Sequence, residues 1–217
     1  MNDVLQFYLN PRNQLGDQTI AFFQLCAVPI AVSVTIGVVV GVLVYRSAFL
    51  SFVAVNVSDL IRAIPVLAAL FMFVPIFKIG FVPAAVALTL LGIPPVLLNT
   101  YVGLRGVDPA AIESARGMGM TAWQIMSRVQ APLVLPVIAA GVRTAAVQIV
   151  ATAPLGGLIG AGGYGDYIID GVNTLNTTEI LAGSILVAAL AFLVEVGMSG
   201  LERWLTPAGL MVKFVEG

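Results

Sequence analysis

The sequence predicts an all-α integral membrane protein with five membrane-spanning helices and a pair of short helices between the third and fourth spans. Two observations support this. Only 10% of the 217 residues are charged and 59% are hydrophobic, with a mean hydropathy of +1.04, whereas soluble domains carry about 25% charged residues. Long apolar stretches also alternate with short polar segments, and a helix needs only ~20 apolar residues to cross the bilayer.

The chain begins with a polar stretch, residues 1–18, which precedes the first predicted span, residues 21–45. The polar stretch contains Asp3, Arg12 and Asp17. It lacks the basic-then-apolar order of a signal peptide, so we expect it to be retained as an extracytoplasmic segment. The span itself is uncharged, and the proline within it is tolerable in a packed bundle.

The second and third spans are predicted over residues 52–77 and 81–104. We interpret the second as one helix that bends at Pro65, with Asp59 and Arg62 in charged first turns at the cytoplasmic interface. The third span is uncharged and is interrupted by glycine and a pair of prolines. Both are long enough to span as helices.

The polar segment 108–132 separates the third and fourth spans and reads as two short helices on the membrane surface. Asp108 is a good N-cap, and Pro109 occupies the first helical position, where its missing N–H costs nothing. Gly117 and Gly119 are expected to end this helix. Thr121 followed by Gln124 is a capping-box pattern that opens a second helix, which we expect to stop before Pro132. An apolar stripe is expected at Ala111, Ile112, Ala115 and Met118.

The fourth and fifth spans are predicted over residues 133–158 and 179–204, with a glycine-rich loop from 156 to 176 and a cytoplasmic tail over 205–217. The fourth span carries Arg143 and the fifth carries Glu195 at a comparable depth. A charge inside a span costs several kcal/mol unless it faces a partner or water. We favour a structural Arg143–Glu195 ion pair; a gate or switch and interfacial snorkelling remain the alternatives.

The basic residues predict the orientation, because cytoplasmic loops are enriched in lysine and arginine. One side is predicted to hold seven: Arg46, Arg62, Arg105, Arg116, Arg128, Arg203 and Lys213. The other side is predicted to hold two, Arg12 and Lys78. This distribution places the N-terminus outside and both the 108–132 segment and the C-terminus in the cytoplasm.

The segment 108–132 also resembles the "EAA" signature of ABC importer permeases. The matching residues are Glu113, Ser114, Ala115, Gly119, Val129 and Pro132. Both spacings of the signature hold, although Ser114 replaces an alanine, Val129 an isoleucine and Ala131 a leucine. The resemblance implies the ABC transmembrane type-1 fold and a coupling helix that docks on a separate ATP-hydrolysing subunit. An ordinary amphipathic connector is the alternative.

Further stretches resemble the branch of these permeases that imports osmoprotectants. They include residues 61–65 (IRAIP), 99–104 (NTYVGL), 141–146 (GVRTAA) and 159–166 (IGAGGYGD). The resemblance implies transport of a quaternary amine such as glycine betaine, choline, carnitine or proline betaine. Methionine and other type I permeases share the glycine loop, so an amino acid is the alternative solute. The loop is either a structural turn or a substrate contact through Gly160, Gly162, Gly163, Gly165 and Asp166.

The resemblance also implies partners. These are ABC ATPase subunits that bind ATP and Mg, a second permease subunit (identical or paralogous) and an extracytoplasmic solute-binding protein. The location implied is the lipid bilayer of a bacterial or archaeal cytoplasmic membrane. The chain itself has no phosphate loop and no histidine, and its only cysteine is Cys26. We therefore expect no catalytic residues, metal or cofactor in it.

The net charge of −1 gives no indication of nucleic acid. An ion-coupled secondary transporter would be expected to show intramembrane acidic residues and inverted repeats. Glu195 is the only candidate acid well inside a span, and the sequence shows no internal repeat. We therefore rank this class of transporter below an ATP-driven permease.

Overall fold

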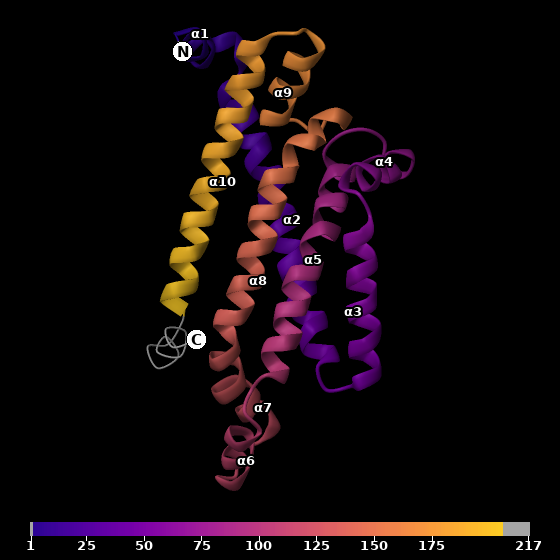
Figure 1. Ribbon diagram of the computed structural model, residues 1–217, viewed down its shortest axis with the longest axis vertical. Helices are drawn as coiled ribbons and strands as arrows, with labels where there is room; N and C mark the ends of the chain where they lie inside the picture. The colour runs from indigo at the N-terminus through magenta and orange to yellow at the C-terminus, as the bar shows by residue number, and fades with distance from the viewer. Residues whose placement is uncertain (1, 206–217) are drawn as a thin grey trace.

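The computed structural model describes residues 2–205, and every regular element among them is helical (Figure 1). The elements are α1 (Asn2–Leu9), η1 (Pro11–Asn13), α2 (Leu15–Val44), α3 (Ala48–Ala63), α4 (Val66–Phe77), α5 (Phe81–Arg105), α6 (Pro109–Gly117), α7 (Ala122–Ile125), η2 (Met126–Gln130), α8 (Ala131–Thr152), η3 (Ala153–Ile159), α9 (Tyr164–Asn173) and α10 (Thr177–Leu205). The predicted tail beyond residue 205, including Lys213, lies outside the described residues.

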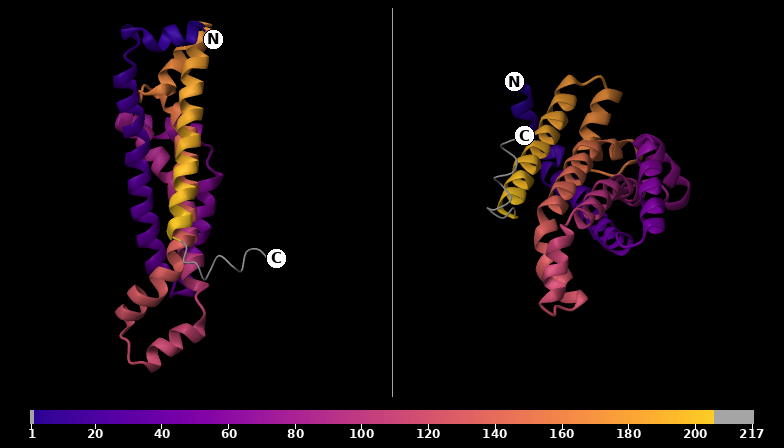
Figure 2. Two further views of the ribbon diagram at one scale, coloured as in Figure 1. Left: turned by 90° about the vertical axis from the view of Figure 1, so that its left-hand side faces the viewer. Right: turned by 60° about the horizontal axis from the view of Figure 1, so that its bottom comes forward.

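The helices confirm the predicted all-α membrane fold. Four stretches within residues 2–205 are long and apolar enough to cross a membrane: Pro11–Val44, Phe81–Arg105, Ala122–Ile159 and Thr177–Leu205. A fifth crossing arises if the bent pair α3 and α4 counts as one span. The molecule is elongated, with α1 and α9 near one end and α6 and α7 at the other (Figures 1 and 2). We refer to these as the α1–α9 end and the α6–α7 end.

The second span differs from the prediction of one gently bent helix. Its two helices meet at 93°, and α4 crosses the upper part of α5 (Figure 1). Ser47 caps α3 directly after α2, accepting a hydrogen bond from the Leu50 N–H, and α3 then rises about 24 Å. Arg62, in its last turn, therefore lies away from the α6–α7 end. The prediction that Arg62 shares a side with Arg46 and Arg105 is wrong, because the helix begins four residues earlier than expected.

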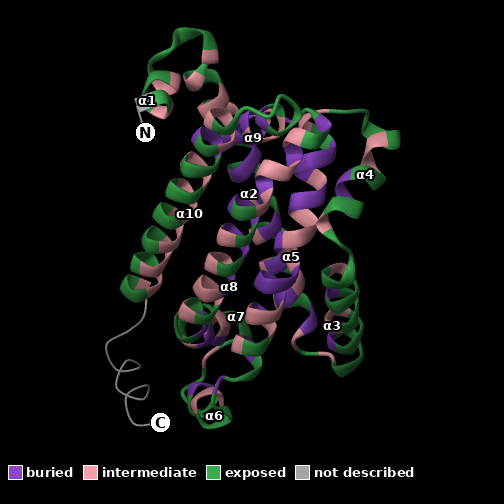
Figure 3. Cartoon of the chain, turned by 45° about the horizontal axis from the view of Figure 1, so that its top comes forward, coloured by how far each residue is buried: buried purple, intermediate pink, exposed green. Residues whose placement is uncertain are grey.

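The centre of the fold is the packing of α2 and α8 on α5 (Figure 3). Small residues bring the α2 and α5 backbones together. A Cβ on Gly37 would lie 2.7 Å from Val96 Cβ, and one on Gly41 would lie 2.7 Å from Thr100 Cβ. Small residues four apart are the usual means of close helix contact in membranes, where the lipid supplies no hydrophobic force between helices. This seam positions α5, from which the segment to α6 departs.

The α1–α9 end is more regular than the loop predicted over 156–176. It forms the 3₁₀ helix η3 and the α-helix α9, so the irregular parts are the link 160–163 and the turn 174–176. Gly160, Gly162 and Gly163 have positive φ values of 67°, 83° and 88°, which a side chain with a β-carbon disfavours. These glycines supply the left-handed backbone angles that connect η3 to α9, so both flanking segments remain helical.

Candidate functional site

The candidate functional site is the α6–α7 segment, whose first helix begins as the sequence predicts. Asp108 accepts a hydrogen bond from the Ala110 N–H at 2.9 Å, and Pro109 is the first helical residue. This cap satisfies one of the free N–H groups of the first turn. Only three residues, 106–108, separate the end of α5 at Arg105 from the start of α6 at Pro109, and this short link keeps the segment close to α5.

The turn after α6 is a Schellman motif centred on Gly119, whose φ is +79°. Met120 N–H donates to the Ala115 carbonyl at 3.1 Å, and Gly119 N–H donates to the Arg116 carbonyl at 2.9 Å. These two bonds satisfy carbonyls that the helix end would leave free. The residue in the left-handed conformation is thus Gly119, while Gly117 remains the last residue of α6.

The second helix starts with the predicted capping box but does not end before Pro132. Thr121 N–H donates to Gln124 Oε1 at 2.8 Å, and Gln124 N–H donates to Thr121 Oγ1 at 3.4 Å. The chain then passes through a π-helical turn, Met126–Gln130, into α8. Ala131 N–H bonds to the Met126 carbonyl, five residues back. This wider turn accommodates the proline, because a π-bulge absorbs the interrupted ladder. The prediction of a stop at Pro132 is therefore wrong.

The signature residues divide between those that face solvent or a partner and those that pack internally. Glu113 and Ser114 are exposed, Ala115 is 1% exposed, Val129 is half-buried and Pro132 is exposed. Met118 was expected on the packed stripe but is 72% exposed, because it lies at the helix end where the chain reverses. With Trp123, which is 77% exposed, it gives an apolar surface to the α6–α7 segment, which protrudes from the bundle (Figure 2).

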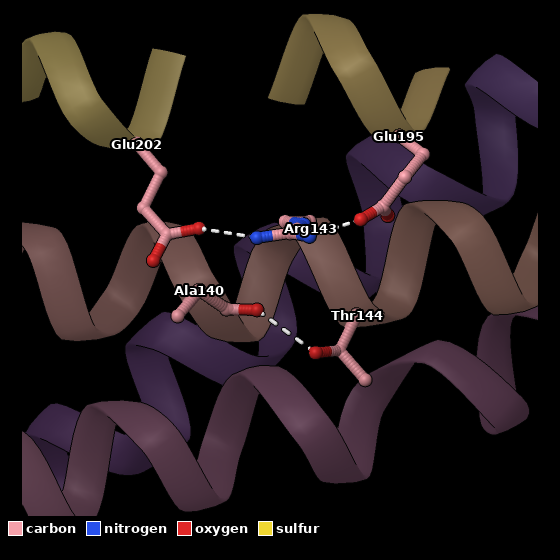
Figure 4. A network of polar contacts seen from close by, with 5 residues as sticks. All are labelled: Ala140, Arg143, Thr144, Glu195 and Glu202. Carbon is pink, nitrogen blue, oxygen red and sulfur yellow. Dashed lines mark hydrogen bonds and ion pairs between the residues drawn. The ribbon is translucent and has the colours of Figure 1, made fainter. Parts of the chain in front are cut away.

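The Arg143 side chain extends from α8 toward α10 and contacts two carboxylates (Figure 4). Its Nη2 pairs with Glu195 Oε1, and its Nη1 donates to Glu202 Oε2 at 3.1 Å. Glu195 was predicted from the sequence as the partner of Arg143, whereas Glu202 was not predicted. The two glutamates are seven residues apart, a spacing of two turns that places them on one helix face; this spacing was the available signal. The network joins α8 to α10.

The glycine link packs on α2. Gly163 N–H donates to Gln18 Oε1 at 2.6 Å, and the Tyr164 hydroxyl donates to Thr19 Oγ1 at 3.0 Å. A Cβ on Gly165 would lie 2.2 Å from the Pro154 carbonyl oxygen. Gly165 is therefore required for close packing. The candidate contact residues 160–165 are arranged around these internal contacts.

Asp166 is the remaining polar residue of this region. Its Oδ1 is buried and has no hydrogen-bond partner among the described residues. Burial, followed by the charge of Asp170, raises the pKa of its carboxyl, while hydrogen bonds from Gln18 and the Gly162 backbone act in the opposite direction. Asp166 is thus a partly desolvated acid outside the membrane-spanning helices.

The fold and the protruding segment together define a polytopic helical membrane protein with a short helical pair outside the bundle. Residues 33–208 match the family described as "Binding-protein-dependent transport system inner membrane component". The chain belongs to this family, the transmembrane component of ABC importers, in which ATP is hydrolysed by a separate subunit.

The relatives are similar over nearly the whole chain. The carnitine transport permease protein OpuCB of Listeria monocytogenes is 37% identical, with 97% of this chain and 96% of the relative covered. The choline transport system permease protein OpuBB of Bacillus subtilis is 35% identical, with 97% of each covered. Among solved structures, the inward-facing MetNI methionine ABC transporter matches with a TM-score of 0.78 at 25% identity, covering 89% of this chain and 96% of that chain.

Proposed function

We propose that this chain moves a quaternary amine osmoprotectant across the cytoplasmic membrane as part of an ATP-driven importer. The observation that carries the proposal is the similarity, over 97% of the chain, to permeases named for carnitine and choline. Both solutes carry a trimethylammonium group, which has no hydrogen-bond donor. Glycine betaine and proline betaine belong to the same chemical class.

The working complex contains two permease chains, two ATPase subunits that bind ATP and Mg, and an extracytoplasmic solute-binding protein. The second permease is either an identical copy or a paralogue. One bundle of this size does not enclose a path for an organic solute. The α6–α7 end faces the cytoplasm and the N-terminus lies outside, which is supported by Arg46, Arg105, Arg116, Arg128 and Arg203, located on elements that end near the segment.

The α6–α7 segment transmits the motion of the ATPase to the membrane helices. Glu113 and the exposed apolar side chains of Met118 and Trp123 contact the ATPase surface. The helical path from α7 through the π turn to α8 is continuous, so a displacement of the segment moves α8 directly. The ion pairs of Arg143 carry α10 with α8. Closure of the ATPase subunits then switches the pathway between inward and outward access.

Reconstitution of the chain with its ATPase and binding protein tests this function. Proteoliposomes containing ATP should accumulate radiolabelled choline, carnitine or glycine betaine. Omitting the ATPase should abolish accumulation, and dissipating ion gradients with an ionophore should leave it unchanged. Concentrative uptake by the chain without ATP would contradict the proposal.

Methionine is the second candidate solute, because the MetNI transporter shares the fold at 25% identity. The same proteoliposomes distinguish the two classes of solute. Excess unlabelled glycine betaine, but not excess methionine, should compete with labelled choline. Competition by methionine alone, together with methionine uptake, would replace the quaternary amine by an amino acid and leave the ATP-driven mechanism intact.

A further inference from the structure

Two adjoining cavities lie between the turn after α2 and the α6–α7 segment. Their volumes are about 390 and 290 Å³. They share five lining residues: Tyr45, Arg46, Ile112, Arg116 and Gln130. We call this concave region the Arg46–Arg116 pocket. It is formed by residues some 70 positions apart in the chain.

The pocket carries an excess of positive charge. Arg46, Arg105 and Arg116 line it, and Glu113 is its only acidic lining residue. The Arg46 side chain donates to the Tyr45 hydroxyl, and Arg105 donates to the Tyr101 hydroxyl at 3.1 Å. Arg116 makes no side-chain hydrogen bond within residues 2–205. Arg143, by contrast, has two carboxylate partners. The pocket arginines thus retain N–H donors for a ligand.

Gln130 is an independent indication of a ligand. It is 4% exposed and lines both cavities. Its side-chain amide makes no hydrogen bond to any other described residue, and its nitrogen and oxygen are not among the fully buried unpaired atoms, so they remain accessible from the cavities that Gln130 lines. Most side-chain amides in protein interiors are paired, so an amide that reaches a cavity without a partner is available to donate a hydrogen bond to a ligand. Gln130 also occupies the π-helical turn, an element often found at functional sites.

The base of the pocket is apolar. Leu104, Val107 and Val134 form a small buried cluster that packs with Tyr45 and Ile112, and Ile112, Met120 and Ile125 also line the cavity. The pocket lies where α2 and α5 end, at Tyr45 and Arg105. Arginine N–H donors next to an apolar lining suit a ligand that joins a phosphate group to an apolar part.

We propose that the Arg46–Arg116 pocket binds a phosphate group. Arginine presents a fork of N–H donors that matches phosphate oxygens, and several arginines can share one phosphate. The phosphate comes either from an anionic phospholipid headgroup or from a soluble phosphate ion. Bound between the two arginines, it connects the α2–α3 turn to α6 and restrains the orientation of the α6–α7 segment.

The test uses the permease assembled with its ATPase in nanodiscs of phosphatidylcholine containing phosphatidylglycerol. After transfer to detergent, native mass spectrometry counts the phosphatidylglycerol that each complex retains. The variants are Arg46→Gln with Arg116→Gln, and separately Gln130→Leu, which keeps the volume of the side chain. Arg128→Gln is the matched control, because Arg128 lies on the same π-helical turn, is exposed and does not line either cavity.

The double variant should retain about tenfold less phosphatidylglycerol than the wild type, since two charge-assisted contacts are lost. The Gln130→Leu complex should retain severalfold less phosphatidylglycerol than the wild type. The Arg128→Gln complex should match the wild type. If inorganic phosphate displaces the lipid from the wild type but not from the double variant, the site also accepts the soluble ion. If Arg128→Gln and the double variant lose equal amounts of phosphatidylglycerol, the loss reflects the positive charge of the surface in general, and the proposed site is wrong. Unchanged lipid retention in the double variant, together with unchanged binding of inorganic phosphate, would overturn it as well.

Discussion

Gly119 is the single residue whose backbone conformation sets the direction of the chain between α6 and α7. A Cβ there meets nothing within 4 Å, so a substitution acts only through the left-handed backbone angle. Gly119→Val should strain the turn by about 1–2 kcal/mol. We expect normal membrane insertion but reduced ATPase co-purification or reduced uptake per ATP hydrolysed.

Gly117 provides a matched control for this prediction. A Cβ on Gly117 also meets nothing within 4 Å, but this residue lies in α6 with negative φ. Gly117→Val should therefore retain ATPase binding and uptake. If both variants behave like the wild type, the turn is a passive connector and the proposed coupling role is wrong.

Arg143 is an intramembrane charge satisfied by two acceptors rather than one. Glu195→Gln leaves Glu202 in place, and Glu202→Gln leaves Glu195, so each single variant should lose less thermal stability than Arg143→Gln. Residues in contact show non-additive effects. In a double-mutant cycle followed by thermal unfolding, Arg143→Gln with Glu195→Gln should lose less than the sum of the single losses. Strict additivity would contradict the pairing.

We expect Asp166 to give the stability of the fold a pH dependence opposite in sign to that of a salt-bridged acid. Its pKa in the folded chain is raised by burial and by Asp170, so folding favours the protonated form. The charged form therefore destabilises the fold above the folded pKa, and this penalty disappears below the unfolded pKa of about 3.9. Asp166→Asn should be at least as stable as the wild type at pH 7.

The measurement is the thermal unfolding midpoint of both proteins in detergent from pH 7 to pH 4. The advantage of Asp166→Asn should shrink as the pH falls, because the wild-type carboxyl becomes protonated. A wild-type protein that is more stable than the variant at pH 7 and loses that advantage in acid would show that the carboxylate stabilises the fold.

Among the helix contacts, the seam between α2 and α5 depends on glycines on α2, which have no side chain to keep the two backbones apart. Gly41→Leu would place its Cβ 2.7 Å from Thr100 Cβ and its remaining atoms inside α5. Overpacking of this kind costs about 1–3 kcal/mol or more. We expect a lower unfolding temperature and a smaller yield of folded protein.

Gly197 on α10 is the control for this seam, since a Cβ there meets nothing within 4 Å. Gly197→Leu introduces the same side chain into a membrane helix without a close neighbour inside the chain. It should leave the unfolding temperature unchanged. Equal destabilisation by Gly41→Leu and Gly197→Leu would indicate that leucine in any such helix is harmful, and would remove the argument for close packing.

At the scale of the whole molecule, the unbroken helical path from α7 to α8 predicts how the segment and the bundle communicate. Two glycines inserted between Gln130 and Ala131 should interrupt this path, because glycine is a poor helix former. The ATPase should still bind and hydrolyse ATP, while solute uptake should fall close to background.

The control insertion places two glycines after Leu175, in the exposed turn between α9 and α10. Exposed turns tolerate insertions well, so uptake in this variant should stay near that of the wild type. Normal uptake after the insertion at Gln130 would show that α8 does not carry the motion of the segment.

Local sequence determined much of the fold and much of the α6–α7 segment. The apolar runs predict the positions of the long helices, because a backbone buried in lipid must satisfy its N–H and C=O groups by internal hydrogen bonds. The Asp108 cap, the Gly119 turn and the Thr121–Gln124 capping box are contacts between residues two to five positions apart. Such contacts depend on side chains next to each other in the sequence, so pattern alone identifies them.

Only the tertiary structure decided how distant elements meet. It showed the course of α3, which carries Arg62 away from Arg46, the 93° break between α3 and α4, the second carboxylate on Arg143, the contact of Gly163 with Gln18 and the pocket shared by Arg46 and Arg116. These features join residues far apart in the chain, and their distances follow from helix crossing and close packing. A linear pattern specifies which faces are apolar, but not which neighbour each face meets, because many partners bury an apolar face equally well.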